Sequence, residues 1–130
     1  KSKEVGMMLN VIRESPEVRL WGDRLVLTGD GERLLVGSVI FHGRPSNGVA
    51  EIGYGVEESW QRQGIATEAT RACVEWALAQ DGIAGVQATT FPWHLASLGV
   101  IRNLGMVQIG SRDHDTLGEL LIFERRRPPI

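Results

Sequence analysis

The chain has 130 residues, of which 42% are hydrophobic and 23% charged, with a formal net charge of −2 and a pI near 5.9. This length predicts one domain that can bury a core. The charge excludes the basic footprint typical of nucleic-acid-binding proteins. No apolar run approaches membrane-spanning length, and the first residues show no secretory pattern. The single cysteine, Cys73, excludes an intrachain disulfide and favours a reducing cytoplasm.

Before residue 49 the chain consists of short apolar segments separated by turn residues. Apolar side chains at helical spacing predict a helix over 5–14, which Ser15-Pro16 ends. Residues 19–28 are predicted to form a strand. Residues 34–42 are its expected antiparallel partner, because Gly29-Asp30-Gly31 between them is a turn sequence.

Residues 49–56 show the alternation of a half-buried strand. One face carries Ala50, Ile52, Tyr54 and Val56. The other face carries Glu51 with Gly53 and Gly55. The missing side chains of these two glycines leave room for a ligand beside Glu51.

The remainder of the chain predicts two helices that alternate with strands. A helix that begins near Gly64 precedes a strand over 85–91, and a second helix from Leu95 ends at Gly105. Two strands over 106–111 and 119–125 close the chain. This mixed order predicts an α+β fold in which a central sheet is flanked by helices on both faces.

The helix that begins near Gly64 has the strongest pattern. Apolar residues recur on one side of it, whereas Glu68, Arg71 and Glu75 lie three and four residues apart on the outer face. The first N–H groups of a helix have no intrahelical partner and carry partial positive charge. Because Gly64 and Ala66 are small, this helix start is predicted to bind a phosphate or pyrophosphate.

The glycine spacing narrows the kind of phosphate site. No Lys-Ser or Lys-Thr follows, which excludes a P-loop, and Gly53-Tyr54-Gly55 has no third glycine opening a helix, which excludes the dinucleotide fingerprint. What remains is Gln61-x-x-Gly64-x-Ala66, preceded by the strand that contains Glu51. This arrangement resembles the acetyl-CoA loop of the GNAT N-acetyltransferase superfamily, whose pattern is Gln/Arg-x-x-Gly-x-Gly/Ala at a strand-to-helix turn.

Two further motifs extend the resemblance over about residues 21–125. His94-x-Ala96-Ser97 is followed by Asn103-Leu104-Gly105-Met106, where the family's usual forms are Asn-x-Ala-Ser and Lys-x-Gly-Phe. The Glu-Ile-Gly-Tyr segment that begins at Glu51 is similar to the branch of Rim-type ribosomal-protein N-terminal acetyltransferases.

The resemblance implies how acetyl-CoA binds. In that fold the central parallel strands splay apart beyond Val56, and pantetheine pairs with strand backbone in the gap. Backbone N–H groups from Gln61 to Thr67 then bind the pyrophosphate. Arg62 either adds a charge-assisted contact or is a solvated arginine. The implied cofactor-binding residues are Val56, Gln61, Arg62, Gln63, Gly64, Ile65, Ala66, Thr67 and His94.

Transfer to an amine requires a base and a proton donor for the departing thiolate. Glu51 is the candidate base; the alternatives are that it binds the acceptor's charge or is merely solvated. Ser97 is the candidate donor, because Ile101 stands where some relatives carry a tyrosine. The alternatives are that water protonates the thiolate or that Ser97 caps its helix. His94 replaces the usual Asn and either contacts pantetheine, assists as a base or is simply exposed.

The expected function is direct, ternary-complex transfer of acetyl from acetyl-CoA to a primary amine, because no cysteine lies near the site. The acceptor is a protein N-terminus or a small-molecule amine. The alternative is a non-catalytic acetyl-CoA-binding sensor or interaction module. We expect no metal site and no nucleic-acid or membrane partner. The resemblance allows a homodimer, as in many relatives, and leaves the oligomeric state open. Residues 1–130 are expected to form one domain with an incomplete N-terminal part, since the family supplies more residues there.

Overall fold

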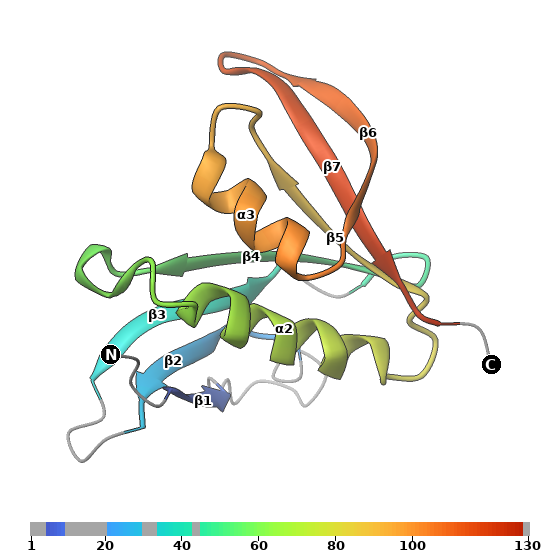
Figure 1. Cartoon of the computed structure of the whole chain (residues 1–130). Helices are drawn as coiled ribbons and strands as arrows, with labels where there is room; N and C mark the ends of the chain where they lie inside the picture. Colours follow the sequence, from blue (N-terminus) through green and yellow to red (C-terminus); the bar gives the residue numbers. More distant parts are fainter. Residues whose placement is uncertain (1–4, 10–20, 30–33, 43–44, 129–130) are drawn as a thin grey trace.

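The computed structural model describes residues 5–9, 21–29, 34–42 and 45–128, and Figure 1 shows the whole chain. Most of these residues belong to regular elements. The elements are β1 (Val5–Leu9), β2 (Arg24–Thr28), β3 (Leu35–Phe41), β4 (Val49–Val56), the 3-10 turn η1 (Glu58–Trp60), α2 (Ile65–Leu78), β5 (Gly85–Thr90), α3 (Leu95–Asn103), β6 (Val107–His114) and β7 (Gly118–Arg126).

The strands form one seven-stranded sheet in the order β1-β2-β3-β4-β5-β7-β6. β1 to β4 pair antiparallel, β4 pairs parallel with β5, and β7 pairs antiparallel with both β5 and β6. A parallel pair needs a crossover connection, and α2 supplies it between β4 and β5. The expected α+β class with a mixed central sheet is therefore confirmed.

The pairing of β4 with β5 covers only the beginning of both strands. It runs from Val49 opposite Gly85 to Glu51 opposite Gln87. Beyond that point β4 continues to Val56 and β5 to Thr90 as separate strands, and Figure 1 shows them diverging. This confirms the expected splayed central pair, and the last paired residues, Glu51 and Gln87, mark the vertex of the fork.

Both described helices lie on the same face of β4. Ala50 and Ile52 are buried in the core with the apolar side of α2, and Tyr54, on the same face, is hydrogen-bonded to Ser97 in α3. α2 runs along β3, β4 and β5. Among the described residues, no helix covers the opposite face, which carries Glu51, whereas the sequence predicts helices on both faces.

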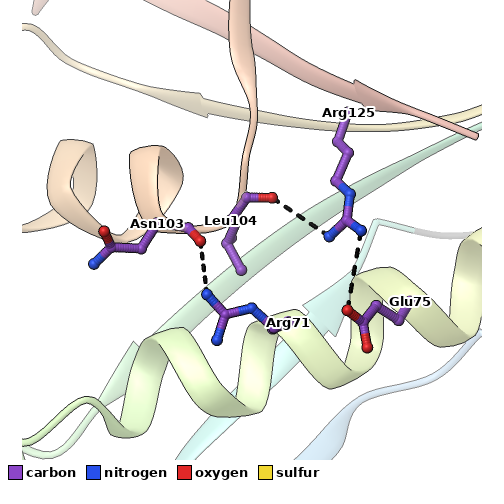
Figure 2. Close-up of polar contacts among 5 residues, drawn as sticks. All are labelled: Arg71, Glu75, Asn103, Leu104 and Arg125. Carbon is purple, nitrogen blue, oxygen red and sulfur yellow. Dashed lines mark hydrogen bonds and ion pairs between the residues drawn. The ribbon is translucent and has the colours of Figure 1, made fainter. Parts of the chain in front are cut away.

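Figure 2 shows the polar contacts that join α2, α3 and β7. The Arg71 guanidinium donates to the carbonyl of Asn103 at 2.7 Å, and Arg125 donates to the carbonyl of Leu104 at 3.4 Å. The Arg125 guanidinium also lies 3.9 Å from the Glu75 carboxylate. Arg71 and Glu75 therefore connect α2 to its neighbours, although their spacing in the sequence suggests pairing along the helix surface.

The N-terminal helix prediction over 5–14 is wrong where the structure tests it. Val5–Leu9 is a strand that pairs antiparallel with β2, from Val5 opposite Thr28 to Leu9 opposite Arg24. So short a run has too few turns to stabilise a helix, and pairing with a sheet edge decides its state. The part of the prediction over 10–14 lies outside the described residues.

The other boundaries differ by smaller amounts. The strand predicted over 19–28 begins at Arg24, after a turn at Trp21, and residues 19–20 lie outside the described part. β6 continues to His114 because it pairs with β7 as far as Gly118. No helix of the described chain is long and apolar enough to cross a membrane.

A cluster of aromatic rings closes the core beneath the C-terminal half of α2. The ring centroids of Trp21 and Phe41 are 5.0 Å apart, and those of Trp21 and Trp76 are 4.9 Å apart. The Arg24 side chain, 6% exposed, lies over Trp76 and Phe41 at 4.3 and 4.8 Å and donates to the carbonyl of Gly22 at 2.8 Å. These cation–π contacts stabilise a buried charge that has no carboxylate partner among the described residues.

Candidate active site

The loop between β4 and α2 presents a set of unpaired backbone donors. Gly64 is the N-cap of α2, with φ of 79° and no side-chain cap, and the first helical bond runs from Glu68 N–H to the Gly64 carbonyl at 2.9 Å. Within the described chain, the N–H groups of residues 62–67 donate to no protein acceptor. This helix start therefore has the donors and the positive dipole end that a phosphate group requires.

The side chain of Gln61 shapes this loop. Its amide nitrogen donates to the carbonyl of Val56 at 2.9 Å, and its own backbone N–H donates to the carbonyl of Glu58 at 3.2 Å. Arg62 then adopts a positive φ of 64° before the helix begins. The Gln61 N–H is therefore already engaged, although the sequence reading assigns it to the pyrophosphate, and Gln61 serves to close the turn. The exposed side chain of Arg62 stays a candidate phosphate contact.

Glu51 lies at the vertex of the fork, on the sheet face opposite the helices. Its side chain is exposed. Gly55 lies further along β4 on the same face, and nothing lies within 4 Å of the position that a Cβ on Gly55 would take. His42, the residue directly after β3, borders Glu51: its backbone N–H donates to the Glu51 carbonyl at 2.9 Å, and its Nε2 lies 3.0 Å from a Cβ placed on Gly53. The sequence reading did not place His42 in this site, because only the β3–β4 register brings it there.

On the other face, β4 and α3 meet through two hydroxyl groups. The hydroxyl oxygens of Tyr54 and Ser97 are 2.9 Å apart, and the Tyr54 hydroxyl lies 3.2 Å from the Ser97 carbonyl. Burial raises the pKa of Tyr54 above its usual value of 10, and the hydrogen bond with Ser97 partly opposes that shift. The phenol is therefore protonated at neutral pH. Ile101, at 0% exposure, lies in the core.

The amino-acid sequence was compared with models of known protein families. Residues 5–107 match the model of the acetyltransferase (GNAT) domain, which is more than half of the chain. The chain belongs to the GNAT family.

One curated relative and two solved structures support this GNAT assignment. An uncharacterized N-acetyltransferase of Bacillus subtilis, YjdG, is 31% identical over 74 residues, which is 56% of this chain and 44% of YjdG. A GNAT-family acetyltransferase from Bacillus anthracis superposes with a TM-score of 0.71 at 23% identity, over 81% of this chain and 66% of that chain. RimJ of Mycobacterium smegmatis, in complex with a coenzyme A disulfide, gives 0.69 at 22% identity, over 85% and 56%.

These structural matches confirm the GNAT fold, and they include a Rim-type enzyme as the resemblance implies. The chain spans less than half of the length of its curated relative. It also spans about two thirds or less of the two solved structures.

His94 has a structural role in this GNAT domain. It is the N-cap of α3, and its Nδ1 accepts a hydrogen bond from the Ser97 N–H at 3.3 Å. The cap is therefore the histidine, and the Ser97 hydroxyl is left to pair with Tyr54. The His94 ring stacks on Trp93, which in turn stacks on Phe91, at centroid distances of 5.9 and 5.0 Å.

The structure divides the predicted site residues into two groups. The loop residues and Ser97 lie on the helix side of the fork, whereas Glu51 lies on the opposite face at the vertex. Tyr54 is the functional candidate that the sequence reading missed, although the alternation of β4 already put it on the helix-facing side. Among the described residues, no group of three or more His, Cys, Asp and Glu side chains is arranged to hold a metal ion.

Proposed function

We propose that this chain catalyses acetyl transfer from acetyl-CoA to a primary amine. The observation that supports this most strongly is the fork between β4 and β5, which has a carboxylate at its vertex and an uncapped helix start beside its open end. Members of the family use such a fork to hold acetyl-CoA, which supplies the activated acetyl group. The unpaired N–H groups of residues 63–67 would hold its pyrophosphate, and Arg62 would add a charge to that contact.

Glu51 is the proposed general base. An amine is mostly protonated at neutral pH and becomes a nucleophile only after it loses a proton. The exposed carboxylate of Glu51 can take that proton directly or through water. Gly55 leaves the strand surface beyond Glu51 open for the approaching amine, whereas the His42 side chain lies over Gly53 and borders that space.

Tyr54 and Ser97 form the proposed proton source for the leaving thiolate. The C–N bond forms as the C–S bond breaks, so the proton removed from the amine must be balanced by one delivered to sulfur. The buried phenol of Tyr54 is protonated, and its hydrogen bond with Ser97 fixes both hydroxyls at the start of α3. Two coupled hydroxyls thus take the place of the helix tyrosine that Ile101 replaces.

We propose direct transfer, without an acetyl-enzyme, and the position of Cys73 supports this. Its side chain is buried in the core on α2, and burial raises its pKa to about 11 while Arg24 partly opposes the shift. A thiol in that state is a poor nucleophile at neutral pH. The acceptor we propose is a protein N-terminus or a small amine, and the structural similarity to RimL, a ribosomal L7/L12 alpha-N-protein acetyltransferase, supports the former.

The test is release of free thiol from acetyl-CoA when a panel of N-terminal peptides and small amines is supplied. Glu51→Gln should lower kcat by at least about a hundredfold, in the range typical of a lost general base, with the KM for acetyl-CoA little changed. Glu119→Gln is the matched control, because Glu119 is an exposed carboxylate at the start of β7, opposite Asp113 and outside the predicted site, and it should keep full activity.

A different pattern would contradict this function. If the wild-type chain is stabilised by acetyl-CoA but releases no thiol with any amine, it is an acetyl-CoA sensor or interaction module. Turnover that is unchanged in Glu51→Gln would instead remove the carboxylate from the mechanism and leave the transferase assignment intact.

A further inference from the structure

A row of polar residues crosses the sheet at the vertex of the fork. Glu51, Gln87 and Glu124 lie on the adjacent strands β4, β5 and β7, where Glu51 is paired with Gln87 and Gln87 with Glu124. His42, directly after β3, extends the row, because its N–H donates to the Glu51 carbonyl. Residues paired in neighbouring strands project from the same face of a sheet. The row therefore lies on the face opposite α2 and α3, with Glu51 and Gln87 side by side at its centre.

Glu124 is held firmly in its ionised state. It is 7% exposed, and its two carboxylate oxygens each lie 3.0 Å from a donor, one on Gln87 Nε2 and one on Arg126. The hydrogen bond from Gln87 lowers the pKa of Glu124, burial opposes the shift, and Arg126 adds to it. Gly85 lies beside this carboxylate, because a Cβ placed there would be 3.4 Å from Oε2, in ordinary van der Waals contact.

This ionised carboxylate fixes the orientation of the Gln87 amide. A carboxylate only accepts hydrogen bonds, so the amide must turn its NH₂ group toward Glu124. Its carbonyl oxygen then points away from Glu124, and no donor among the described residues reaches it. Glu51 is the neighbour of Gln87 on its other side. The partly exposed Gln87 thus carries an unused acceptor close to the candidate base.

We propose that the Gln87 carbonyl oxygen is a second contact for the acceptor nitrogen and that Glu124 is its positioning residue. This inference rests on the proposed acetyl transfer. A primary amine that gives one proton to Glu51 keeps further N–H groups, and a fixed acceptor beside Glu51 binds one of them. The amine is thereby oriented with its lone pair free at the vertex of the fork. Glu124 acts only through the amide that it orients.

The test compares steady-state kinetics of Gln87→Leu, Glu124→Gln and the double variant with wild type, with an amine that the wild type acetylates. Gln87→Leu should raise the KM for the amine about three- to tenfold, the range for one lost hydrogen bond, and leave the KM for acetyl-CoA within about twofold. Glu124→Gln should give a smaller rise, because a neutral amide no longer dictates how Gln87 is oriented. In the Gln87→Leu background, Glu124→Gln should have no further effect on this KM.

Two further variants separate this role from simple structural support. Gln108→Leu makes the same change on the edge strand β6, where the exposed Gln108 donates to the Gly110 carbonyl, and it should leave both KM values unchanged. Gln87→Met keeps the length of the side chain without the acceptor. It should show the same rise in the KM for the amine as predicted for Gln87→Leu, and it replaces Gln87→Leu in the test if Gln87→Leu folds poorly. Thermal unfolding of every variant shows whether it is folded.

Three results would overturn the inference. If the wild type acetylates the amine and both folded Gln87 variants have an unchanged KM for it, Gln87 does not contact the acceptor. The proposed function is unaffected by that result. Additive effects in the double variant remove the positioning role of Glu124. A wild type that acetylates no amine overturns the proposed function, and this inference with it.

Discussion

Gly64 has two properties that bear on the site: a left-handed backbone conformation and open space where a side chain would lie. Its φ of 79° lies in the left-handed region, where a side chain is strained, and the space around its missing Cβ is open within the protein. Gly82 has nearly the same geometry, with φ of 81° and an open surrounding, but it lies after the other end of α2. Alanine substitutions at the two glycines should therefore cause the same backbone strain, and only the substitution at Gly64 should also hinder phosphate binding.

Gly64→Ala and Gly82→Ala should destabilise the fold similarly, by about 1 kcal/mol, because each puts a Cβ on a left-handed residue. Only Gly64→Ala should raise the KM for acetyl-CoA, about tenfold or more, because its new methyl group occupies the surface where the pyrophosphate is proposed to bind. Urea unfolding and initial-rate kinetics measure the two effects. Equal acetyl-CoA KM values in the two variants would contradict the proposal that the pyrophosphate binds at this helix start.

At the scale of elements, the hydrogen bond between Tyr54 in β4 and Ser97 in α3 links two elements and also holds the two proposed proton donors. α3 is held in place by Arg71 and Arg125 from two other elements, which leaves the Tyr54–Ser97 pair free for another task. The His94 cap fixes the first turn of α3, and with it the hydroxyl of Ser97. We therefore expect the hydroxyl pair to serve the leaving thiolate more than the stability of α3.

Tyr54→Phe and Ser97→Ala should each lower kcat about tenfold or more while the KM for acetyl-CoA changes little, as expected for groups that act mainly in the transition state. Because the two hydroxyls act as a unit, the double variant should lose little more than the more damaging single variant. Steady-state kinetics of the three variants test this. Unchanged kcat values together with a lower melting temperature would assign the pair to the docking of α3 alone.

At the scale of the whole molecule, the proposed roles divide the two substrates between the faces of the sheet. The helix start and the hydroxyl pair are proposed to serve acetyl-CoA on one side, and Glu51 with Gln87 is proposed to receive the amine on the other. One core supports both sides. It includes the buried Cys73, and the buried Arg24 lies over the rings of Trp76 and Phe41.

That core predicts a loss of stability at alkaline pH. Folding raises the pKa of Cys73 from 9.0 to about 11, because burial disfavours the thiolate. Between these two values the unfolded chain loses a proton that the folded chain keeps, so the free energy of unfolding should fall as pH rises from about 9 to about 11. Urea titrations at several pH values measure the slope. It should be shallower in Cys73→Ala, with the remaining slope due in part to Tyr54, whose pKa is also raised; an identical slope would contradict this.

Much of the fold and part of the site could be predicted from the sequence, because both depend on local patterns. The alternation over 49–56 gave the bounds of β4, and the helical spacing after Gly64 gave α2 with its uncapped start. The N-terminal segment could not be predicted in this way. Val5–Leu9 is too short to determine its own state, and pairing with β2 made it a strand.

What the sequence by itself determined was therefore the type of most elements and the uncapped start of α2, since both arise from residues close together in the chain. Only the tertiary structure decided which side chains meet. Tyr54 joins Ser97 from 43 positions away, and Gln87 joins Glu124 from 37 positions away. The register of the sheet and the docking of α3 set these contacts, and no spacing within a single element encodes either of them.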